Sequence, residues 1–317
     1  MSDVVDRALF ARLPRLADLV PFIPLADGLP TPVERVEDRF WVQRDDLTDS
    51  RYGGNKVRKL EHLLAIAARR GGPVLTAGAT GSHHVVATAV HAARLGLSVE
   101  AVRFPQPLTD HVRSMADHAD RLGVTSIAAP SSTAMPFVLA RRWAQVAPKG
   151  ATLVTPGGST PVGVLGYVGA GLELVERFAA EGWDEPDDVV VALGSGGSSV
   201  GLSLGLALGG WKRASVVAVR VADRIVTNRP VLRGIETGVR SLLALGGGFP
   251  PAARWAIDGR WFGPGYGHPT AAGTEGAARA AELGLASEPT YTAKALAAAF
   301  ERLDAGRTVV FLQTLAA

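Results

Sequence analysis

Residues 188–199 read Asp-Val-Val-Val-Ala-Leu-Gly-Ser-Gly-Gly-Ser-Ser, and this stretch decides the fold class. Six mostly apolar residues lead into a glycine-rich turn, and an apolar stretch of helical length follows at 198–208. A short, continuous apolar run is typical of a strand that is buried on both faces, as in a parallel sheet. We therefore expect a buried strand at 188–193 that turns directly into a helix.

The same alternation of a short apolar run and a helical stretch extends from residue 73 to the end of the chain. Strands are expected at 74–76, 99–103, 125–127, 152–154, 188–193, 215–221 and 308–312, and helices at 82–95, 109–122, 135–146, 163–180, 198–208, 230–245, 270–283 and 292–304. Strands that alternate with helices indicate parallel sheets covered on both faces. The chain is thus predicted to be an α/β protein.

Two sheets fit this pattern better than one, because the block from about residue 60 to 160 already carries four strand–helix units. No Pro/Ser linker separates that block from the rest, so we expect the chain to cross between two domains more than once. Each domain is predicted to be an open, mostly parallel, twisted sheet flanked by helices. Residues 61–161 would form the smaller domain, and residues 1–60 together with 162–317 the larger one.

The bulk composition excludes several classes of function. The chain has 317 residues, 47% hydrophobic content and a formal net charge of only +3. Its arginines occur singly or in pairs, so no nucleic-acid-binding surface is expected. The absence of cysteine excludes disulfides, thiolate nucleophiles and cysteine-ligated metals.

Neither a signal peptide nor a membrane span is expected. Residues 1–7 carry charges where a signal peptide needs an apolar core. The most apolar run, at 200–208, is far shorter than the roughly 20 residues that a membrane span requires. We therefore expect a cytoplasmic protein without membrane contact.

Lys56 is the strongest candidate for a reactive side chain. It is one of five lysines, and it follows a Gly-Gly-Asn turn at the start of a predicted helix. Lys56, Leu60, Leu63 and Ala67 share one helical face, which places the ammonium on the apolar side. Burial lowers the pKa of a lysine, and the free amine is a nucleophile that can form a Schiff base. A solvated lysine in a first helical turn is the alternative, and the local sequence favours neither.

The turn after the strand at 188–193 has the composition of a phosphate cup. Glycines let backbone amides approach an anion, hydroxyls add donors, and the helix N-terminus adds partial positive charge. The members are Gly194, Ser195, Gly196, Gly197, Ser198 and Ser199. A dinucleotide fingerprint is absent because Ser199 stands where its last glycine belongs, and no Gly-Lys-Ser/Thr follows to make a P-loop. A tight turn that binds nothing is the alternative.

Three further stretches carry polar groups beside turns. Ser82, followed by His83 and His84, comes after the predicted strand at 74–76 and taken alone is a helix N-cap. The histidines lack metal-ligand spacing and an acidic partner, so no metal site is expected. The glycine turn at 155–161 could hold a second anionic group. Tyrosines at 266 and 291 stand beside turns and are candidate phenols at a site mouth.

Taken together, these stretches point to a cofactor. Pyridoxal 5′-phosphate (PLP) needs a lysine that forms a Schiff base and a cup for its phosphate, and the sequence offers a candidate for each. It offers no nucleotide motif that would explain the cup in another way. We therefore expect PLP as the cofactor.

From about residue 44 to 314 the chain resembles the 1-aminocyclopropane-1-carboxylate deaminase / D-cysteine desulfhydrase family of fold-type II, tryptophan synthase β-like PLP enzymes. The matching motifs are Arg-Asp-Asp-Leu-Thr at 44–48, Gly-Gly-Asn-Lys-Val-Arg-Lys-Leu-Glu at 53–61, Thr-Ala-Gly-Ala at 76–79, Gly-Gly-Ser at 157–159, Val-Gly-Val-Leu-Gly-Tyr at 162–167, Ala-Leu-Gly-Ser-Gly-Gly at 192–197, Gly-Tyr-Gly at 265–267 and Tyr-Thr-Ala-Lys-Ala at 291–295. Several motifs in the family's order make the resemblance specific.

The resemblance implies which residues meet the cofactor. Lys56 would carry it and move the α- or β-proton, the glycine amides and Lys59 would hold its phosphate, and Thr314 would meet the pyridine nitrogen. A hydroxyl there leaves the ring less electron-withdrawing than an aspartate would, which still suits β-elimination. The full expected set is Asn55, Lys56, Lys59, His83, Gly194, Ser195, Gly196, Gly197, Ser198 and Thr314.

The resemblance also implies which residues meet the substrate. Catalysis is expected from Lys56, Ser82, Tyr266 and Tyr291. Substrate contacts are expected from Ser82, His83, His84, Gly158, Tyr266 and Tyr291. The implied substrate is a small amino acid, and the family implies a homodimer whose larger domain binds PLP while the smaller domain closes over the site.

Two departures from the family pattern bear on the substrate. The family places Gln-Ser-Asn where this chain has Gly81-Ser82-His83, and its asparagine meets the phenolic oxygen of the cofactor. Ring-opening deaminases carry a glutamate after the second tyrosine, where this chain has Thr292. The second departure argues against aminocyclopropane carboxylate and for elimination from a D-cysteine-like amino acid with a sulfur or sulfonate leaving group, giving a 2-oxo acid and ammonia.

Other functions stay open on the sequence. The nearest keep the cofactor and change the chemistry to ring opening, β-replacement or a specialised biosynthetic step. A PLP-binding protein without turnover is a further alternative. A nucleotide-binding α/β protein is disfavoured because both nucleotide fingerprints are absent.

Overall fold

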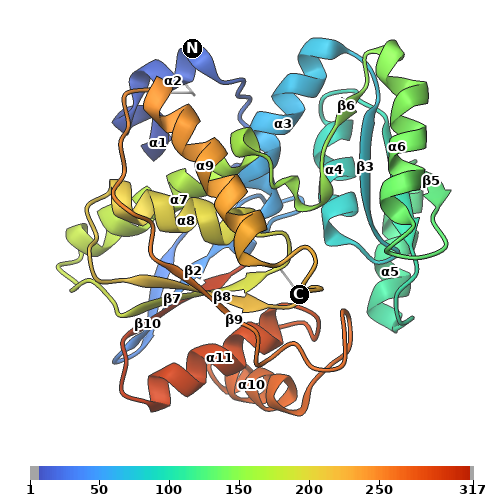
Figure 1. The fold of residues 1–317 in the computed structure, drawn as a ribbon. Helices are drawn as coiled ribbons and strands as arrows, with labels where there is room; N and C mark the ends of the chain where they lie inside the picture. The colour runs from blue at the N-terminus through green and yellow to red at the C-terminus, as the bar shows by residue number, and fades with distance from the viewer. Residues whose placement is uncertain (1–6, 315–317) are drawn as a thin grey trace.

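The computed structural model describes residues 7–314, which form two mainly parallel β-sheets flanked by helices (Figure 1). The six-stranded sheet has the order β1 (Val33–Glu37), β2 (Phe40–Arg44), β10 (Val309–Gln313), β7 (Asp188–Leu193), β8 (Ser215–Arg220) and β9 (Trp255–Asp258). The four-stranded sheet has the order β5 (Thr125–Ala128), β4 (Val99–Phe104), β3 (Val74–Ala79) and β6 (Thr152–Leu153). Within these residues only the β1–β2 pair is antiparallel.

The helices cover both faces of both sheets. Their bounds are α1 (Ala8–Arg12), α2 (Pro14–Leu19), α3 (Lys56–Arg70), α4 (His83–Ala93), α5 (Asp110–Arg121), α6 (Met135–Val146), α7 (Pro161–Ala180), α8 (Gly197–Leu208), α9 (Arg229–Leu245), α10 (Ala271–Glu282) and α11 (Thr292–Asp304). Short 3₁₀ turns are η1 (Asp45–Leu47), η2 (Ala147–Lys149) and η3 (Pro156–Gly158). Hydroxyl or amide oxygens of Thr109, Thr160, Asn228 and Thr270 cap α5, α7, α9 and α10.

Four apolar clusters fill the spaces between these layers. Figure 1 shows α7, α8 and α9 on one face of the six-stranded sheet and α10 and α11 on the other. One cluster joins the sheet to the first group of helices, and another joins its opposite face to α10 and α11. The four-stranded sheet packs against α3 and α4 on one face and against α6 on the other. Because both faces are covered, β7, β8 and β10 are built from nearly continuous valine-rich runs.

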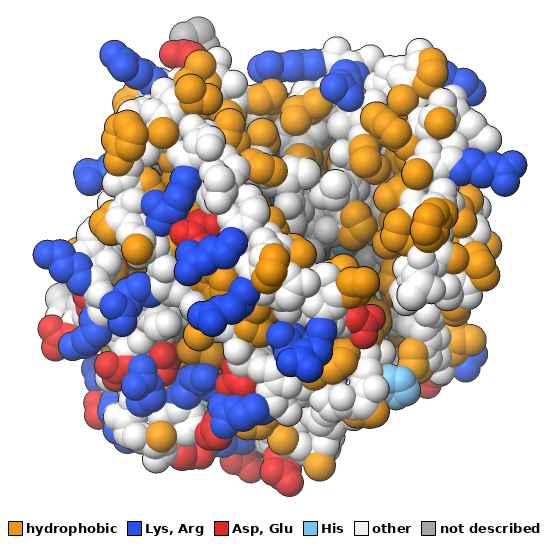
Figure 2. Space-filling view, in the orientation of Figure 1, with side chains coloured by type: hydrophobic (Ala, Val, Ile, Leu, Met, Phe, Trp, Pro, Cys, Tyr) orange, Lys and Arg blue, Asp and Glu red, His pale blue; other side chains and the backbone are white. Residues whose placement is uncertain are grey.

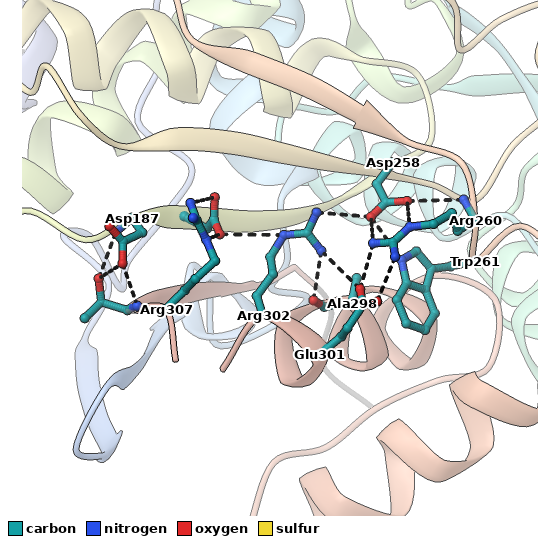
Figure 3. A network of polar contacts seen from close by, with 10 residues as sticks. Asp187, Asp258, Arg260, Trp261, Ala298, Glu301, Arg302 and Arg307 are labelled. Carbon is teal, nitrogen blue, oxygen red and sulfur yellow. Dashed lines mark hydrogen bonds and ion pairs between the residues drawn. The ribbon is translucent and has the colours of Figure 1, made fainter. Parts of the chain in front are cut away.

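Helix α11 is also tied to the six-stranded sheet by charge, as Figure 3 shows. Arg302 of α11 lies 3.1 Å from Asp258 of β9 and 3.6 Å from Asp188 of β7. Arg260 bridges Asp258 and Glu301, each at 2.7 Å. These contacts fix the position of α11, whose first turn lies at the candidate site.

The structure confirms the α/β class and the presence of two sheets. The predicted strand and helix at 188–208 appear as β7 and α8. Strands β1, β2 and β9 and helices α1 and α2 were not predicted. The chain builds β1 and β2, then all of β3 to β6, and returns to complete the first sheet, so it crosses between the sheets more than once. The domain boundaries at 60/61 and 161/162 stay a prediction.

Among the helices of residues 7–314, none combines the length and apolar composition that a membrane span needs. The expectation that the chain has no signal peptide rests on the charges of residues 1–7. Residues 1–6 lie outside the described part of the chain.

Candidate active site

A cavity of about 1190 Å³ lies between the two sheets and is lined by residues from both. Figure 2 shows this face of the molecule hollowed between α9 and α6, with hydrophobic side chains on both sides. Most of the predicted site residues line it: Asn55, Lys56, Lys59, Ser82, His83, His84, Gly194, Ser195, Gly196, Ser198, Tyr266, Tyr291 and Thr314. Gly158 and Gly197 are not in the wall but lie directly behind it.

Lys56 is the first residue of α3, and it lines this cavity. The preceding turn depends on glycine, because Gly54 has φ of 97° and a Cβ on Gly53 would lie 1.9 Å from the backbone oxygen of Asp46. Burial lowers the pKa of Lys56 to about 8, against the opposing effect of the Glu288 carboxylate. Half of the Lys56 side chains therefore lose their proton at about pH 8, and the amine lines the cavity instead of extending into open solvent.

The side chain of Asn55 connects Lys56 to the glycine-rich turn. Its Oδ1 accepts a hydrogen bond from Lys56 Nζ, and its Nδ2 donates one to Ser198 Oγ over 3.3 Å. The backbone N–H of Asn55 donates to the backbone oxygen of Thr314, 2.9 Å away at the end of β10. Segments from three distant parts of the sequence therefore meet at Lys56.

The two glycine-rich turns, which the sequence suggested as separate anion sites, form one cup. Ser159 Oγ lies 2.7 Å from Ser195 Oγ and accepts the backbone N–H of Gly197 over 3.1 Å. A Cβ on Gly197 would lie 2.5 Å from Ser159 Oγ, and a Cβ on Gly157 would lie 2.1 Å from Ser195 Oγ. Only glycines allow the turns to approach this closely.

The cup has the donors that a phosphate group would need. Ser199 Oγ and Thr155 Oγ1 are buried in the cavity wall and have no hydrogen-bond partner within residues 7–314. Ser199 stands in the first turn of α8, where backbone N–H groups and the helix dipole favour an anion. Buried hydroxyls without partners are rare, so these two fit an acceptor group that enters the cup.

Lys59 places its amino group behind the same cup. Its Nζ donates to the backbone oxygen of Gly157 over 3.1 Å and lies 5.5 Å from the centre of the Tyr167 ring. Burial, and then the charge of Lys56, hold the pKa of Lys59 well below its ordinary value. An anion nearby would relieve this penalty and favour the ammonium form.

Tyr266 and Tyr291 share a hydrogen bond between their phenol oxygens. Burial raises the pKa of both phenols, so both keep their protons at neutral pH. Glu288 Oε1 accepts the backbone N–H of Tyr291 over 2.6 Å and that of Thr292 over 2.7 Å. The buried carboxylate thus fixes the first turn of α11 and the tyrosine that it carries, while the Thr292 hydroxyl bonds to Glu288 instead of lining the cavity.

Ser82 and the two histidines stand at the start of α4. Ser82 is at the N-cap position but makes no capping hydrogen bond with its side chain in the described structure. His84 Nε2 lies 3.0 Å from Thr76 Oγ1, and burial lowers the pKa of His84 to about 3. His83 contacts Tyr52 and His111 through its two ring nitrogens, at 2.7 and 2.8 Å.

Several residues of the site were not predicted from the sequence. They are Tyr52, His111 and Glu288. The turn at 155–161 and the hydroxyl of Ser199 were recognisable as part of anion-binding stretches. Glu288 precedes the Tyr-Thr-Ala-Lys motif by three residues, and its side chain accepts the backbone N–H groups of Tyr291 and Thr292, but the sequence pattern is not that of a capping box. Nothing local to Tyr52 or His111 indicates their contact.

Comparisons with known proteins agree with this geometry. The family model for pyridoxal-phosphate dependent enzymes matches residues 25–314. A D-cysteine desulfhydrase of Klebsiella pneumoniae (strain 342) is 33% identical over 286 residues, which is 85% of each chain. A D-cysteine desulfhydrase of Salmonella typhi is 32% identical over 296 residues, which is 88% of each chain.

Solved structures agree as well. A crystal structure described as an ACC deaminase homologue, where ACC is 1-aminocyclopropane-1-carboxylate, has a TM-score of 0.80 and 26% identity, and the match covers 97% of this chain and 94% of that one. A threonine deaminase of T.th. shares the fold alone, with a TM-score of 0.65 and 18% identity over 98% of this chain and 97% of that one. The chain therefore belongs to the pyridoxal-phosphate dependent enzymes, in the fold-type II family that contains D-cysteine desulfhydrase and ACC deaminase.

Proposed function

We propose that this protein is a PLP-dependent lyase that performs α,β-elimination on a small D-cysteine-like amino acid. The reaction would convert the amino acid and water into a 2-oxo acid, ammonia and a thiol or sulfide. The observation that carries the proposal is that Lys56, with its lowered pKa, shares one cavity with two protonated phenols and a phosphate cup. The names of the D-cysteine desulfhydrase relatives support the substrate class.

The residues of this chain would divide the work as follows. The hydroxyls of Thr155 and Ser199, the turn at 194–198 and Lys59 would hold the phosphate of PLP, and Thr314 would meet the pyridine nitrogen. When bound, PLP supplies an electron sink for the charge left by removal of a proton. Lys56, as the free amine, would take the α-proton of the substrate.

Tyr266 and Tyr291 would supply the second proton. Both phenols are protonated and linked, so one can donate to the leaving sulfur while the other stabilises the oxygen that has lost its proton. Ser82, whose hydroxyl makes no capping bond, would approach the substrate carboxylate from α4. Position 292, where ring-opening deaminases carry a glutamate, holds a threonine whose hydroxyl bonds to Glu288. This position therefore presents no carboxylate to the cavity for ring opening, which favours elimination.

The experiment that tests this function combines a spectrum with a substrate scan. The protein is purified with PLP, its absorbance is recorded, and D- and L-amino acids are screened for 2-oxo acid formation. We expect an absorbance band of lysine-bound cofactor, and pyruvate, sulfide and ammonia from D-cysteine. Lys56→Ala would lack both, and Lys149→Ala, which changes an exposed lysine, would keep both.

Other outcomes would separate the alternatives. The band without a 2-oxo acid from any amino acid would contradict a lyase and support a PLP-binding protein without turnover. A product from aminocyclopropane carboxylate, but none from D-cysteine, would support the ring-opening reaction instead. The lack of any band after addition of PLP would contradict the assignment of Lys56.

We infer further that residues 61–161 form a smaller domain that closes over the site, and that the protein is a cytoplasmic homodimer. The cavity lies between the two sheets, which supports closure by one on the other. Leu19, Leu245 and Phe249 expose large apolar side chains near the contact of α2 with α9, which supports a partner surface. Light scattering after size exclusion would give twice the chain mass, and a monomer mass would contradict the dimer.

A further inference from the structure

Tyr52, His83 and His111 form a continuous hydrogen-bonded chain that leads away from the cavity. Tyr52 Oη lies 2.7 Å from His83 Nδ1, and His83 Nε2 lies 2.8 Å from His111 Nε2. Tyr52 and His83 line the cavity. His111 does not line it, but stands partly exposed in the first turn of α5. The Tyr52 end of this hydrogen-bonded series therefore faces the cavity, and the His111 end faces solvent.

The protonation states of the first two groups are set by their surroundings. Burial, together with the charges of His111 and Lys56, lowers the pKa of His83 to about 3. His83 is therefore a neutral imidazole with one ring proton. Burial raises the pKa of Tyr52, so its phenol keeps its proton.

A neutral imidazole between two partners allows two hydrogen-bond directions. In the first, Tyr52 Oη donates to His83 Nδ1, and the proton on His83 Nε2 is donated to His111 Nε2. In the second, His83 Nδ1 donates to Tyr52 Oη, and His111 Nε2 donates to His83 Nε2. The phenol proton then turns toward Met115 Sδ, 3.7 Å away, which can accept it weakly. Both directions hold the same number of protons, and passage from the first to the second moves each proton by one step, so that one proton enters at Tyr52 and another leaves at His111.

We propose that Tyr52, His83 and His111 form a proton relay between the active-site cavity and solvent. In one direction a proton from the cavity binds to Tyr52 Oη, the phenol proton passes to His83 Nδ1, the Nε2 proton of His83 passes to His111, and His111 releases its Nδ1 proton to water. One proton enters and one leaves, so no redox partner is needed. The reverse sequence returns a proton to the cavity.

The relay rests on the proposed function in one respect: elimination and the hydrolysis that follows it require protons to enter and leave a closed site. The sequence resemblance places an asparagine at the position of His83. An asparagine can hold two partners but cannot pass a proton between them. His83 therefore gives this chain a path that the usual residue does not provide.

The relay can be tested first without substrate or cofactor. Nitrogen NMR of protein with ¹⁵N-labelled histidine would show one protonated and one unprotonated Nε2 for His83 and His111, with scalar coupling between them. The coupling would disappear in His111→Phe and persist in His118→Phe. His118 is the matched control because it stands on the same helix and contacts the Tyr52 ring, at 6.0 Å between centroids, without belonging to the chain of bonds. Two protonated Nε2 atoms in the wild type would overturn the proposal.

The kinetic test separates a relay from a merely structural contact. His111→Gln keeps a hydrogen-bond partner for His83 but cannot pass a proton. We expect His111→Gln and His111→Phe to lower kcat by about tenfold or more with KM unchanged, to raise the solvent isotope effect, and to regain activity with added imidazole. His118→Phe would keep the wild-type values.

Wild-type kcat in His111→Gln would overturn the relay, since the contact would then serve packing alone. A loss of activity that imidazole does not restore, with an unchanged isotope effect, would overturn it as well. The NMR arm needs no turnover. If the wild type forms no 2-oxo acid while the coupling is present, the proposed function fails and the hydrogen-bonded chain stands.

Discussion

The side-chain amide of Asn55 donates a hydrogen bond to Ser198 Oγ over 3.3 Å, although 143 residues separate them in the chain. Asn55 also accepts the hydrogen bond of Lys56 Nζ. One short side chain therefore sets the position of the Lys56 amine relative to the glycine-rich turn at 194–198. The cofactor would contact both places at once, so this contact should affect its binding more than the stability of the fold.

Asn55→Ala should weaken the binding of PLP by roughly fivefold to tenfold, which is the loss of about one hydrogen bond. The dissociation constant is measured by absorbance titration of the cofactor-free protein. Asn228→Ala is the control, because Asn228 caps α9 and its loss should cost about 1 kcal/mol of stability without changing PLP affinity. Equal affinities for wild type and Asn55→Ala would show that the bridge has no role in binding.

The reaction of cofactor-free protein with PLP should depend on pH through Lys56. Only the free amine attacks the aldehyde, and burial lowers the pKa of Lys56 to about 8. The attachment rate should therefore rise with pH and reach half its maximum near pH 8, below the ordinary lysine value of 10.5. Stopped-flow absorbance measures this rate.

Glu288→Gln should shift that midpoint to lower pH. The Glu288 carboxylate favours the ammonium form of Lys56, and its removal leaves burial as the main influence on the pKa. The glutamine oxygen can still accept backbone N–H groups from the first turn of α11. A midpoint that stays in place or moves upward would contradict the assigned effect of Glu288.

Tyr266→Phe and Tyr291→Phe should each lower kcat by about 10²-fold or more while PLP stays bound, as expected for loss of a proton donor. Because the two phenols share a hydrogen bond, the double variant should lose far less than the product of the single effects. Steady-state kinetics and the cofactor spectrum measure the two quantities. Multiplicative losses would mean that the phenols act independently.

Arg58→Met should destabilise the protein by about 3–5 kcal/mol, because it leaves buried carboxylates without their partner. The guanidinium lies 2.9 Å from Asp45 and 2.8 Å from Glu173, and the Arg58 side chain is 2% exposed. Urea unfolding of the cofactor-free protein gives the free energy. Arg35→Met is the control. It removes an ion pair to Asp38 at the surface and should change the free energy of unfolding by no more than about 1 kcal/mol.

How much the sequence predicted depends on how local each signal is. Lys56 was predicted because Leu60, Leu63 and Ala67 share its helical face, and all three are buried in the structure. The cup was predicted because its glycines follow a strand directly. Strand β1 was missed because it reads Val-Glu-Arg-Val-Glu, and a charged strand at a sheet edge gives little apolar signal.

Contacts made only by tertiary structure could not be predicted. Tyr52 and His83 are 31 residues apart, and His83 and His111 are 28 apart, so no periodic pattern relates them. The joining of the turns through Ser159 and Ser195 likewise depends on how η3 packs against the start of α8. The residue types at these positions were visible, but their partners were not.

Strand β10 is the last element along residues 7–314, so it is synthesised after the others described here, yet it lies between β2 and β7 in the middle of the six-stranded sheet. Until it arrives, the strand that precedes the Lys56 loop and the strand that precedes the phosphate cup have no shared neighbour. The backbone oxygen of Thr314, which receives the N–H of Asn55, arrives with it. A nascent chain therefore cannot assemble the cofactor site before residues 309–314 have been made, and an aldehyde as reactive as PLP meets no finished pocket until then.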